Sequence, residues 1–157
     1  MTFPFFPPVH SSVRLATSLK LSVKSDYAAR AVLTLARRHA VGKTTHAEDI
    51  ADDSGIPANY LPQILIELKA QEIVKSTRGK QGGYFLARAP SEITLADVLR
   101  CVYGPLFDTP ALRDPQCPAE LKAAWRGLQS AVEVAATRVN FQQLVESGSE
   151  RGRMFYI

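Results

Sequence analysis

Cysteine is scarce in this sequence: Cys101 and Cys117 are the only two among 157 residues. Two cysteines are too few for a disulfide scaffold, which favours a reducing compartment such as the cytoplasm. Long apolar runs are also missing, since no stretch approaches the eighteen residues that a membrane-spanning helix needs. The start of the chain is a poor signal peptide, because its apolar run precedes any positive charge and is interrupted by Pro4, Pro7 and Pro8.

The common patterns of enzyme sites are absent as well. The sequence has no Cys-x-x-Cys, no glycine-rich nucleotide loop and no catalytic-triad spacing, which argues against a small redox or electron-carrying protein. Its three histidines, His10, His39 and His46, lack the spacing of metal ligands. An apolar fraction of 46% and a charged fraction of 22% are ordinary for a globular protein.

Positive charge is concentrated in the first part of the chain. The net charge is +4, but residues 1–90 have a balance of +5 and residues 91–157 a balance of −1. A basic region favours an anionic partner such as DNA, although a basic solvated surface has the same composition.

The first two predicted helices follow from apolar spacing and capping residues. The first covers about residues 25–40 and has Ser25 as its cap. The second is short. Thr45 and Glu48 have the spacing of a capping box, in which Thr45 caps the helix and Glu48 reaches back.

A turn at residues 53–55 separates the second helix from a third. The third helix begins between residues 56 and 60 and ends near residue 71. Its buried face is the stripe Leu61, Ile64, Leu65 and Leu68. Two helices joined by a short turn that contains glycine are typical of a helix–turn–helix.

A β-hairpin is predicted directly after these helices. Residues 72–77 and 84–87 are strand candidates, and the segment between them is basic and rich in glycine. A hairpin in this position is the wing of a winged helix–turn–helix.

A long helix is predicted in the second half of the chain. Thr94 caps a short helix through about residue 102, and a proline-rich loop at 105–115 leads to a helix over 118–138. The apolar residues of the long helix have the alternating spacing of a heptad seam; they are Leu121, Trp125, Leu128, Val132, Ala135 and Val139. Such a seam needs a partner. The simplest partner is a second copy of the chain, although packing of the seam on its own domain is the alternative. Asn140 caps a last short helix, 141–145.

The expected fold is therefore mainly α-helical with a small β-hairpin wing. It comprises an N-terminal arm at 1–19, a winged-helix DNA-binding domain at 20–104, and a segment at 105–157 that contains a linker loop, the dimerisation helix and the C-terminal residues.

Several runs of the sequence resemble the Rrf2 family of winged-helix transcriptional regulators. The matching runs are LSVKSDYAARAVLTLA (21–36), the segment from IADDSG to ITLADVLR (50–100), which contains STRG (76–79) and GYFLAR (83–88), and VNFQQLVE (139–146). The resemblance implies a homodimer that crosses through the long helices, presents two recognition helices and two wings to a palindromic operator, and has no enzymatic activity.

The third helix and the wing carry the candidate DNA contacts. Asn59 and Gln63 are amides that can pair with adenine in the major groove, and Gln63 matches the family's base-contacting position. The family's usual glutamate before it is Pro62 here, which indicates a different operator. If the helix begins at Tyr60, then Pro62 falls in its first turn and Asn59 can instead be its cap.

The wing candidates are Arg78, Gly79 and Lys80. Arg78 can enter a narrow A·T-rich minor groove, and glycines allow a close backbone approach. Weaker candidates for phosphate contacts are Thr45 and His46 at a helix N-terminus, together with Lys24 and Tyr27 on the first helix. A solvated hairpin tip is the alternative for the wing.

The sensing site departs from the family pattern. Cluster-binding members have three cysteines between the short and the long helix, whereas this chain has only Cys117 there. No cofactor and no metal site are therefore expected, although a cluster completed by Cys101, by Asp108 or Asp114, or by the other subunit stays open. If a cysteine senses anything, we expect Cys117 to do so, because a helix N-terminus favours the thiolate.

The function predicted from the sequence is that of a homodimeric DNA-binding regulator, more consistent with a repressor than an activator, with no membrane partner. Two alternatives share the fold: a protein-interaction module without specific DNA binding, and a cysteine or iron–sulfur redox sensor. The sequence does not indicate the effector or the operator.

Overall fold

The computed structural model describes residues 21–154, so the predicted arm at 1–19 lies outside the described residues. The order of its main elements is α1 (Val23–His39), α2 (Ala47–Ser54), α3 (Leu61–Ala70), β1 (Val74–Thr77), β2 (Gly83–Leu86), α4 (Leu95–Tyr103), α5 (Ala119–Thr137) and α6 (Phe141–Met154). Two short 3-10 turns, η1 (Pro90–Glu92) and η2 (Pro110–Leu112), flank α4. The prediction of a mainly helical winged-helix fold is confirmed.

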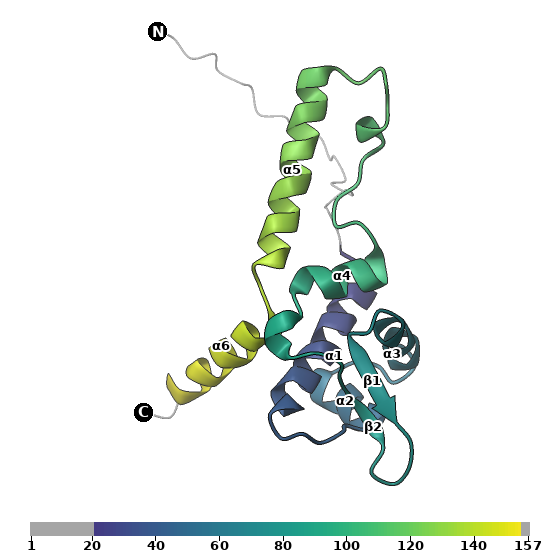
Figure 1. The fold of residues 1–157 in the computed structure, drawn as a ribbon, viewed down its shortest axis with the longest axis vertical. Helices are drawn as coiled ribbons and strands as arrows, with labels where there is room; N and C mark the ends of the chain where they lie inside the picture. The colour runs from purple at the N-terminus through teal and green to yellow at the C-terminus, as the bar shows by residue number, and fades with distance from the viewer. Residues whose placement is uncertain (1–20, 155–157) are drawn as a thin grey trace, which may run out of the picture.

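Figure 1 shows a lower region that holds α1 to α4 and the hairpin, with α5 extending upward from it. The hairpin is a two-stranded antiparallel sheet in which Val74 pairs with Leu86 and Thr77 with Gly83. Among the described residues, no helix combines the length and the apolar character needed to cross a membrane.

Helix α1 forms the centre of the core. Ala28, Ala31 and Val32 on this helix are fully buried, and their small side chains allow the other helices to pack closely. The predicted cap at Ser25 is wrong. The N-cap is Ser22, whose hydroxyl accepts the Ser25 N–H at 3.2 Å, and Ser25 itself is buried in the first turn.

The predicted capping box at the start of α2 is also wrong. The N-cap of α2 is His46, which makes no side-chain capping bond. Thr45 is instead paired with β2: its N–H donates to the carbonyl of Tyr84 at 2.9 Å, and the Tyr84 N–H donates back at 2.8 Å. A β-branched residue suits this extended pairing, which adds a third short segment beside the hairpin.

Helix α3 begins one residue later than the latest predicted start. Its N-cap is Tyr60, and Asn59 lies in the preceding turn, so the alternative in which Asn59 caps the helix is wrong. Pro62 falls in the first turn of α3. A proline costs little there, because the N–H groups of a first turn have no partner within the helix.

The chain returns from α5 into the core through α6. Phe141 is 0% exposed and packs in the same apolar cluster as α1. The segment before α4 and the segment before α6 run side by side, because the Leu95 N–H donates to the Val139 carbonyl at 2.8 Å and the Phe141 N–H to the Ile93 carbonyl at 3.0 Å. The segment that enters α4 and the segment that follows α5 therefore lie next to each other.

Asn140 caps α6 as the sequence predicts. Its carboxamide oxygen accepts the Gln143 N–H at 2.9 Å, and the Gln143 side chain accepts the Asn140 N–H at 3.0 Å. The predicted end at residue 145 is wrong, since α6 continues to Met154. The extra turns are polar and contain two glycines, so they lack the apolar spacing on which the prediction relied.

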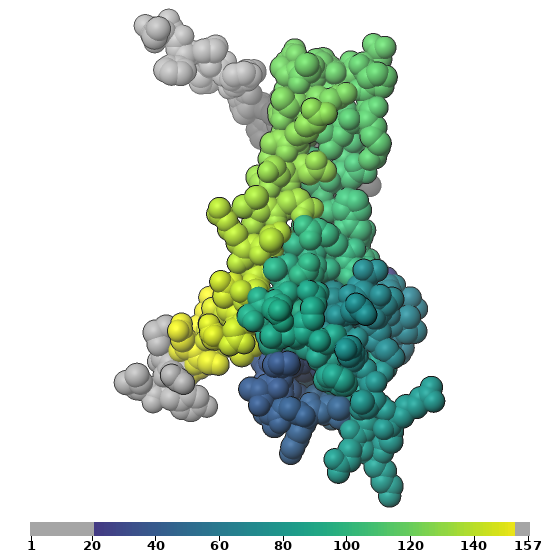
Figure 2. Space-filling view, in the orientation of Figure 1, coloured from purple at the N-terminus to yellow at the C-terminus, as the bar shows by residue number. Residues whose placement is uncertain are grey.

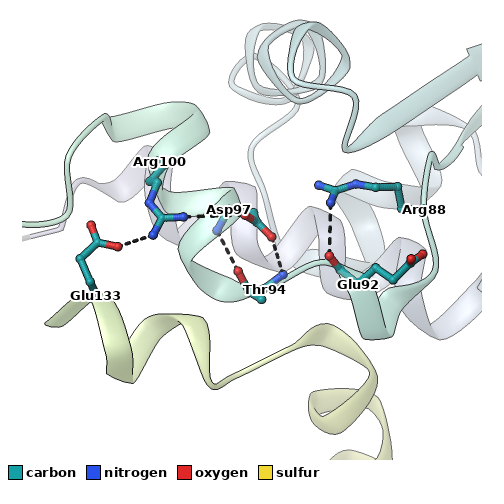
Figure 3. Close-up of polar contacts among 6 residues, drawn as sticks. All are labelled: Arg88, Glu92, Thr94, Asp97, Arg100 and Glu133. Atoms are coloured by element: carbon teal, nitrogen blue, oxygen red, sulfur yellow. Dashed lines mark hydrogen bonds and ion pairs between the residues drawn. The ribbon is translucent and has the colours of Figure 1, made fainter. Parts of the chain in front are cut away.

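Polar side chains join α4 to α5. Arg100 on α4 forms ion pairs with Glu133 on α5 and, at 3.8 Å, with Asp97 of its own helix (Figure 3). Asp97 also accepts the Thr94 N–H at 2.9 Å while Thr94 accepts the Asp97 N–H at 3.2 Å, so the cap predicted at Thr94 is confirmed and is part of a capping box. The Arg100–Glu133 ion pair therefore joins α4 to the C-terminal part of α5.

Candidate nucleic-acid interface

Helix α3 has one buried and one exposed face. The predicted stripe of Leu61, Ile64, Leu65 and Leu68 is buried. The exposed face presents Pro62, Gln63 and Ile66, and Ile66 is 60% exposed. A polar amide beside an exposed apolar side chain suits the major groove, where base edges offer hydrogen-bonding groups and thymine offers a methyl group.

Gln63 is held by a neighbour on the same helix. Its side-chain nitrogen donates to the Glu67 Oε1 atom at 2.9 Å, and the Lys24 ammonium donates to the same oxygen at 2.5 Å. Lys24, a predicted phosphate contact, is therefore paired within the protein. Burial acts to raise the pKa of Glu67, but the Gln63 and Lys24 hydrogen bonds and the Lys24 charge outweigh it, so the pKa lies below its usual range.

The wing residues lie in the turn that joins β1 and β2. Arg78, Gly79 and Lys80 are all exposed, and Gly79 has φ of 107°, which favours glycine. Figure 2 shows this turn projecting from the lower end of the molecule. Within the described chain Arg78 makes no ion pair, so its guanidinium is available to a partner.

The base of the wing is attached to the loop before α2. The Thr44 hydroxyl donates to the carbonyls of Gln81 and Gly82 at 2.8 and 3.1 Å. A Cβ atom added at Gly83 would lie 2.7 Å from the Thr45 carbonyl oxygen, so only glycine permits this approach. The wing and the start of α2 are therefore positioned together.

Thr45 does not belong to the exposed surface. It is 1% exposed, and its hydroxyl has no hydrogen-bond partner among the described residues. This burial excludes the phosphate contact predicted for its side chain. The backbone N–H of Thr45 is not available either, because it is paired with Tyr84. The neighbouring His46 is exposed, and Thr44 lies at the base of the wing.

Tyr27 on α1 is half-buried beside the start of α3. Its ring meets that of Tyr60 edge-on at a centroid distance of 5.6 Å, and the Arg30 guanidinium lies 5.9 Å from its centroid. Tyr27 therefore helps to position the start of α3. Asn59 is exposed in the turn beside it.

The predicted seam of α5 divides between two sides. Leu121 and Leu128 are each 45% exposed, and Ala135, two turns beyond Leu128, is exposed as well. Trp125 stacks on Phe107 of the same chain at a centroid distance of 6.1 Å. Val132 packs against the small cluster that α4 and α5 share. Leu121, Leu128 and Ala135 thus form an apolar face that the described chain does not cover. We call this surface the Leu128 face.

The available donors do not fit a metal cluster held by one chain. Within residues 21–154, no three His, Cys, Asp or Glu side chains form a metal-binding group. Burial, and next the Glu67 charge, raise the pKa of the Cys101 thiol, which is the opposite of what a thiolate ligand needs. Cys117 is half-buried beside the start of α5.

The two aspartates of the loop before Cys117 already have partners. Asp108 pairs with Arg113 at 2.7 Å, and an Asp114 carboxylate oxygen accepts the Gln116 N–H at 2.9 Å. The two aspartates that could complete a cluster are therefore engaged within their own loop.

Sequence reasoning missed three residues of this surface. Ile66 was detectable as an apolar residue outside the buried stripe of α3. Glu67 was detectable from its position one turn after Gln63, the spacing at which helical side chains interact. Thr44 had no such signal, because its contacts are to a hairpin that is distant in the sequence.

Comparison with known proteins gives consistent matches. A family model described as Rrf2, iron-dependent transcriptional regulator, matches residues 21–147. The HTH-type transcriptional regulator CymR of Bacillus subtilis is 31% identical over 141 residues, which cover 88% of this chain and all of the relative, 100%. The HTH-type transcriptional regulator IscR of Photorhabdus laumondii is 29% identical over 133 residues, covering 82% of this chain and 80% of the relative.

Solved structures agree in fold. The structure of CymR, the global cysteine regulator of B. subtilis, superposes with a TM-score of 0.72 at 30% identity, covering 83% of this chain and 98% of that one. The structure of T. potens IscR gives a TM-score of 0.70 at 28% identity, covering 84% and 90%. The chain belongs to the Rrf2 family of DNA-binding helix–turn–helix transcriptional regulators, a family of regulators and not of enzymes.

Proposed function

We propose that this protein acts in the cytoplasm as a homodimeric repressor that binds a palindromic operator. The observation that carries the proposal is the fixed relation between α3 and the wing. The Lys69 side chain on α3 donates to the Ser76 hydroxyl of β1 at 2.7 Å, and the wing base is attached to the start of α2. The exposed side of α3 and the basic turn can then contact one duplex together, the helix in the major groove and Arg78 in the minor groove.

The Leu128 face supports the homodimer. Exposed leucines at 121 and 128 on one side of a long helix form an apolar surface that a second copy can cover isologously. Two copies related by a twofold axis would present two α3 helices, which supports the proposal of a palindrome whose half-sites lie about one helical turn apart.

The iron dependence in the family description does not extend to the proposal. The described part of the chain offers one half-buried cysteine in α4 and one before α5, and a cluster on one chain needs more ligands. The proposal therefore includes no cluster held by the residues of a single chain.

The test is selection of binding sites by the purified full-length protein from a random-sequence duplex library. We expect enrichment of an inverted repeat, and an affinity for it that falls steeply with salt because many contacts are to phosphate. Enrichment of no sequence would contradict the proposal and favour a protein-interaction module; enrichment of a site without symmetry would contradict the dimer.

Gln63→Ala should reduce affinity for the selected operator by about 1–3 kcal/mol and leave affinity for unrelated duplexes nearly unchanged. The reason is that an amide paired with a base edge contributes only where that base is present. Fluorescence anisotropy titrations with both duplexes measure the difference. Gln142→Ala on α6 is the matched control, and an equal loss on both duplexes would exclude base reading by Gln63.

Arg78→Ala should weaken binding by about tenfold, or 1.4 kcal/mol, on operators with A·T-rich flanks and by less on G·C-rich flanks. A narrow A·T minor groove has the more negative potential, so the guanidinium gains more there. Titration of operators that differ only in their flanks measures the effect. Arg88→Ala removes an exposed cation away from the hairpin tip and should affect both duplexes equally (Figure 3). The same loss on both flanks for Arg78→Ala would contradict minor-groove insertion.

A further inference from the structure

The exposed side of α3 carries a small network around a single carboxylate oxygen. The Oε1 atom of Glu67 accepts one hydrogen bond from the Gln63 amide at 2.9 Å and another from the Lys24 ammonium at 2.5 Å. The side chains of Lys24 and Glu67 are 34% and 24% exposed, so the network is partly shielded from water at the edge of the candidate interface. It joins α1 to the residue that is expected to read a base.

Glu67 determines how the Gln63 amide is oriented. An ionised carboxylate only accepts hydrogen bonds, so the nitrogen of the Gln63 amide, and not its oxygen, must face Glu67. One N–H of Gln63 is then in use, which leaves its carbonyl oxygen and at most one N–H for DNA. A glutamine without this neighbour can turn its amide and offer both N–H groups instead.

This orientation has a consequence for base choice. In the major groove, adenine offers an acceptor at N7 beside a donor at N6, whereas guanine offers two acceptors at N7 and O6. An amide that shows one acceptor and one donor matches adenine. Guanine is matched only by two donors, and the Gln63 amide held by Glu67 does not have two to offer.

Glu67 also limits the positive charge of the interface. The Lys24 ammonium is paired with it, so Lys24 contributes less to the attraction of phosphate than a free lysine would. Loss of the Glu67 charge would release Lys24 and strengthen binding to DNA of any sequence.

We propose that Glu67 is a positioning residue that restricts Gln63 to adenine and lowers affinity for unrelated DNA by pairing with Lys24. The inference rests on the proposed function, since it assumes that Gln63 meets a base. Glu67 itself need not touch DNA.

Selection from random duplexes by variants tests the proposal. Gln63→Ala identifies the base pair that Gln63 reads, by loss of preference there. Glu67→Ala should lower the ratio of adenine to guanine at that same base pair at least fivefold, and raise affinity for unrelated duplexes. Glu67→Gln has no charge and can offer Gln63 a donor as well as an acceptor, so it should bind unrelated duplexes more tightly and lose less of the adenine preference than Glu67→Ala does.

The chain offers a matched control on α6. The Gln142 side chain donates to Glu146 at 2.7 Å with the same spacing, so Glu146→Ala removes an equivalent pair and an equal charge away from α3. It should leave the base preference unchanged. An unchanged preference in Glu67→Ala would overturn the proposal, and so would a change confined to a base pair that Gln63→Ala does not affect, because Glu67 would then read that base itself.

A measurement without DNA separates this inference from the proposed function. The side-chain amide resonances of Gln63, identified by their absence in Gln63→Ala, should shift in Glu67→Ala and stay in place in Glu146→Ala. Amide resonances that do not shift would overturn the positioning role whether or not the protein binds an operator. A selection in which the wild-type protein enriches no sequence would instead reject the proposed function.

Discussion

Leu128→Glu is expected to convert the protein into monomers that fold but do not bind the operator. Leu128 is 45% exposed on α5, so a glutamate at this position is tolerated in a single chain. In a dimer it would place a charge in an apolar interface, once from each subunit. Loss of a buried leucine alone costs about 2–5 kcal/mol. The dimer dissociation constant should therefore rise by at least about a thousandfold.

Analytical ultracentrifugation and operator titration measure this result. Ser130→Glu adds the same charge at an exposed position on the opposite side of α5, and it should remain a dimer. A Leu128→Glu protein of dimeric mass that still binds the operator would contradict the assignment of the Leu128 face as the dimer interface. Circular dichroism separates a folded monomer from an unfolded chain.

Phe141→Ala should lower the free energy of unfolding by about 3–5 kcal/mol. Phe141 is 0% exposed and lies in the cluster that surrounds α1, so truncation leaves a cavity where α6 meets the winged-helix core. Urea unfolding followed by circular dichroism, at one fixed protein concentration, measures the loss. The concentration is fixed because association contributes to apparent stability.

Tyr103→Ala is the control for Phe141→Ala. Tyr103 is also aromatic but is 49% exposed at the end of α4, and its truncation should cost less than about 1 kcal/mol. Equal effects of the two substitutions would mean that α6 is not part of the core.

The features that depend on residues close together in the chain were the parts of the fold that the sequence predicted well. The stripe of α3 and the hairpin follow from local spacing, and so does the cap at Thr94, because each depends on residues close together in the chain. Thr45 has the same local pattern as Thr94, yet its backbone pairs with Tyr84 on β2. A capping pattern contains no information about a strand that arrives from further along the chain.

The main candidates of the site were predictable from the sequence, but the contacts between elements that are distant in the chain were not. Gln63 and Arg78 stand out because of their residue type and position. The pairing of Lys24 with Glu67 depends on how α1 crosses α3, which spacing within either helix does not specify. The division of the α5 seam was unpredictable for the same reason, because Trp125 stacks on Phe107, which lies outside the helix.

The paired backbone segments before α4 and before α6 make residues 104–118 a place where the protein can change its length. Hydrogen bonds at Leu95 and Phe141 hold the segment before α4 and the segment before α6 together, and neither bond involves the loop at 104–118. Lengthening a flexible loop is inexpensive, about 0.6 kcal/mol for each doubling. A peptide epitope or a fluorescent reporter inserted near Asp114 should therefore leave the recognition helix in place.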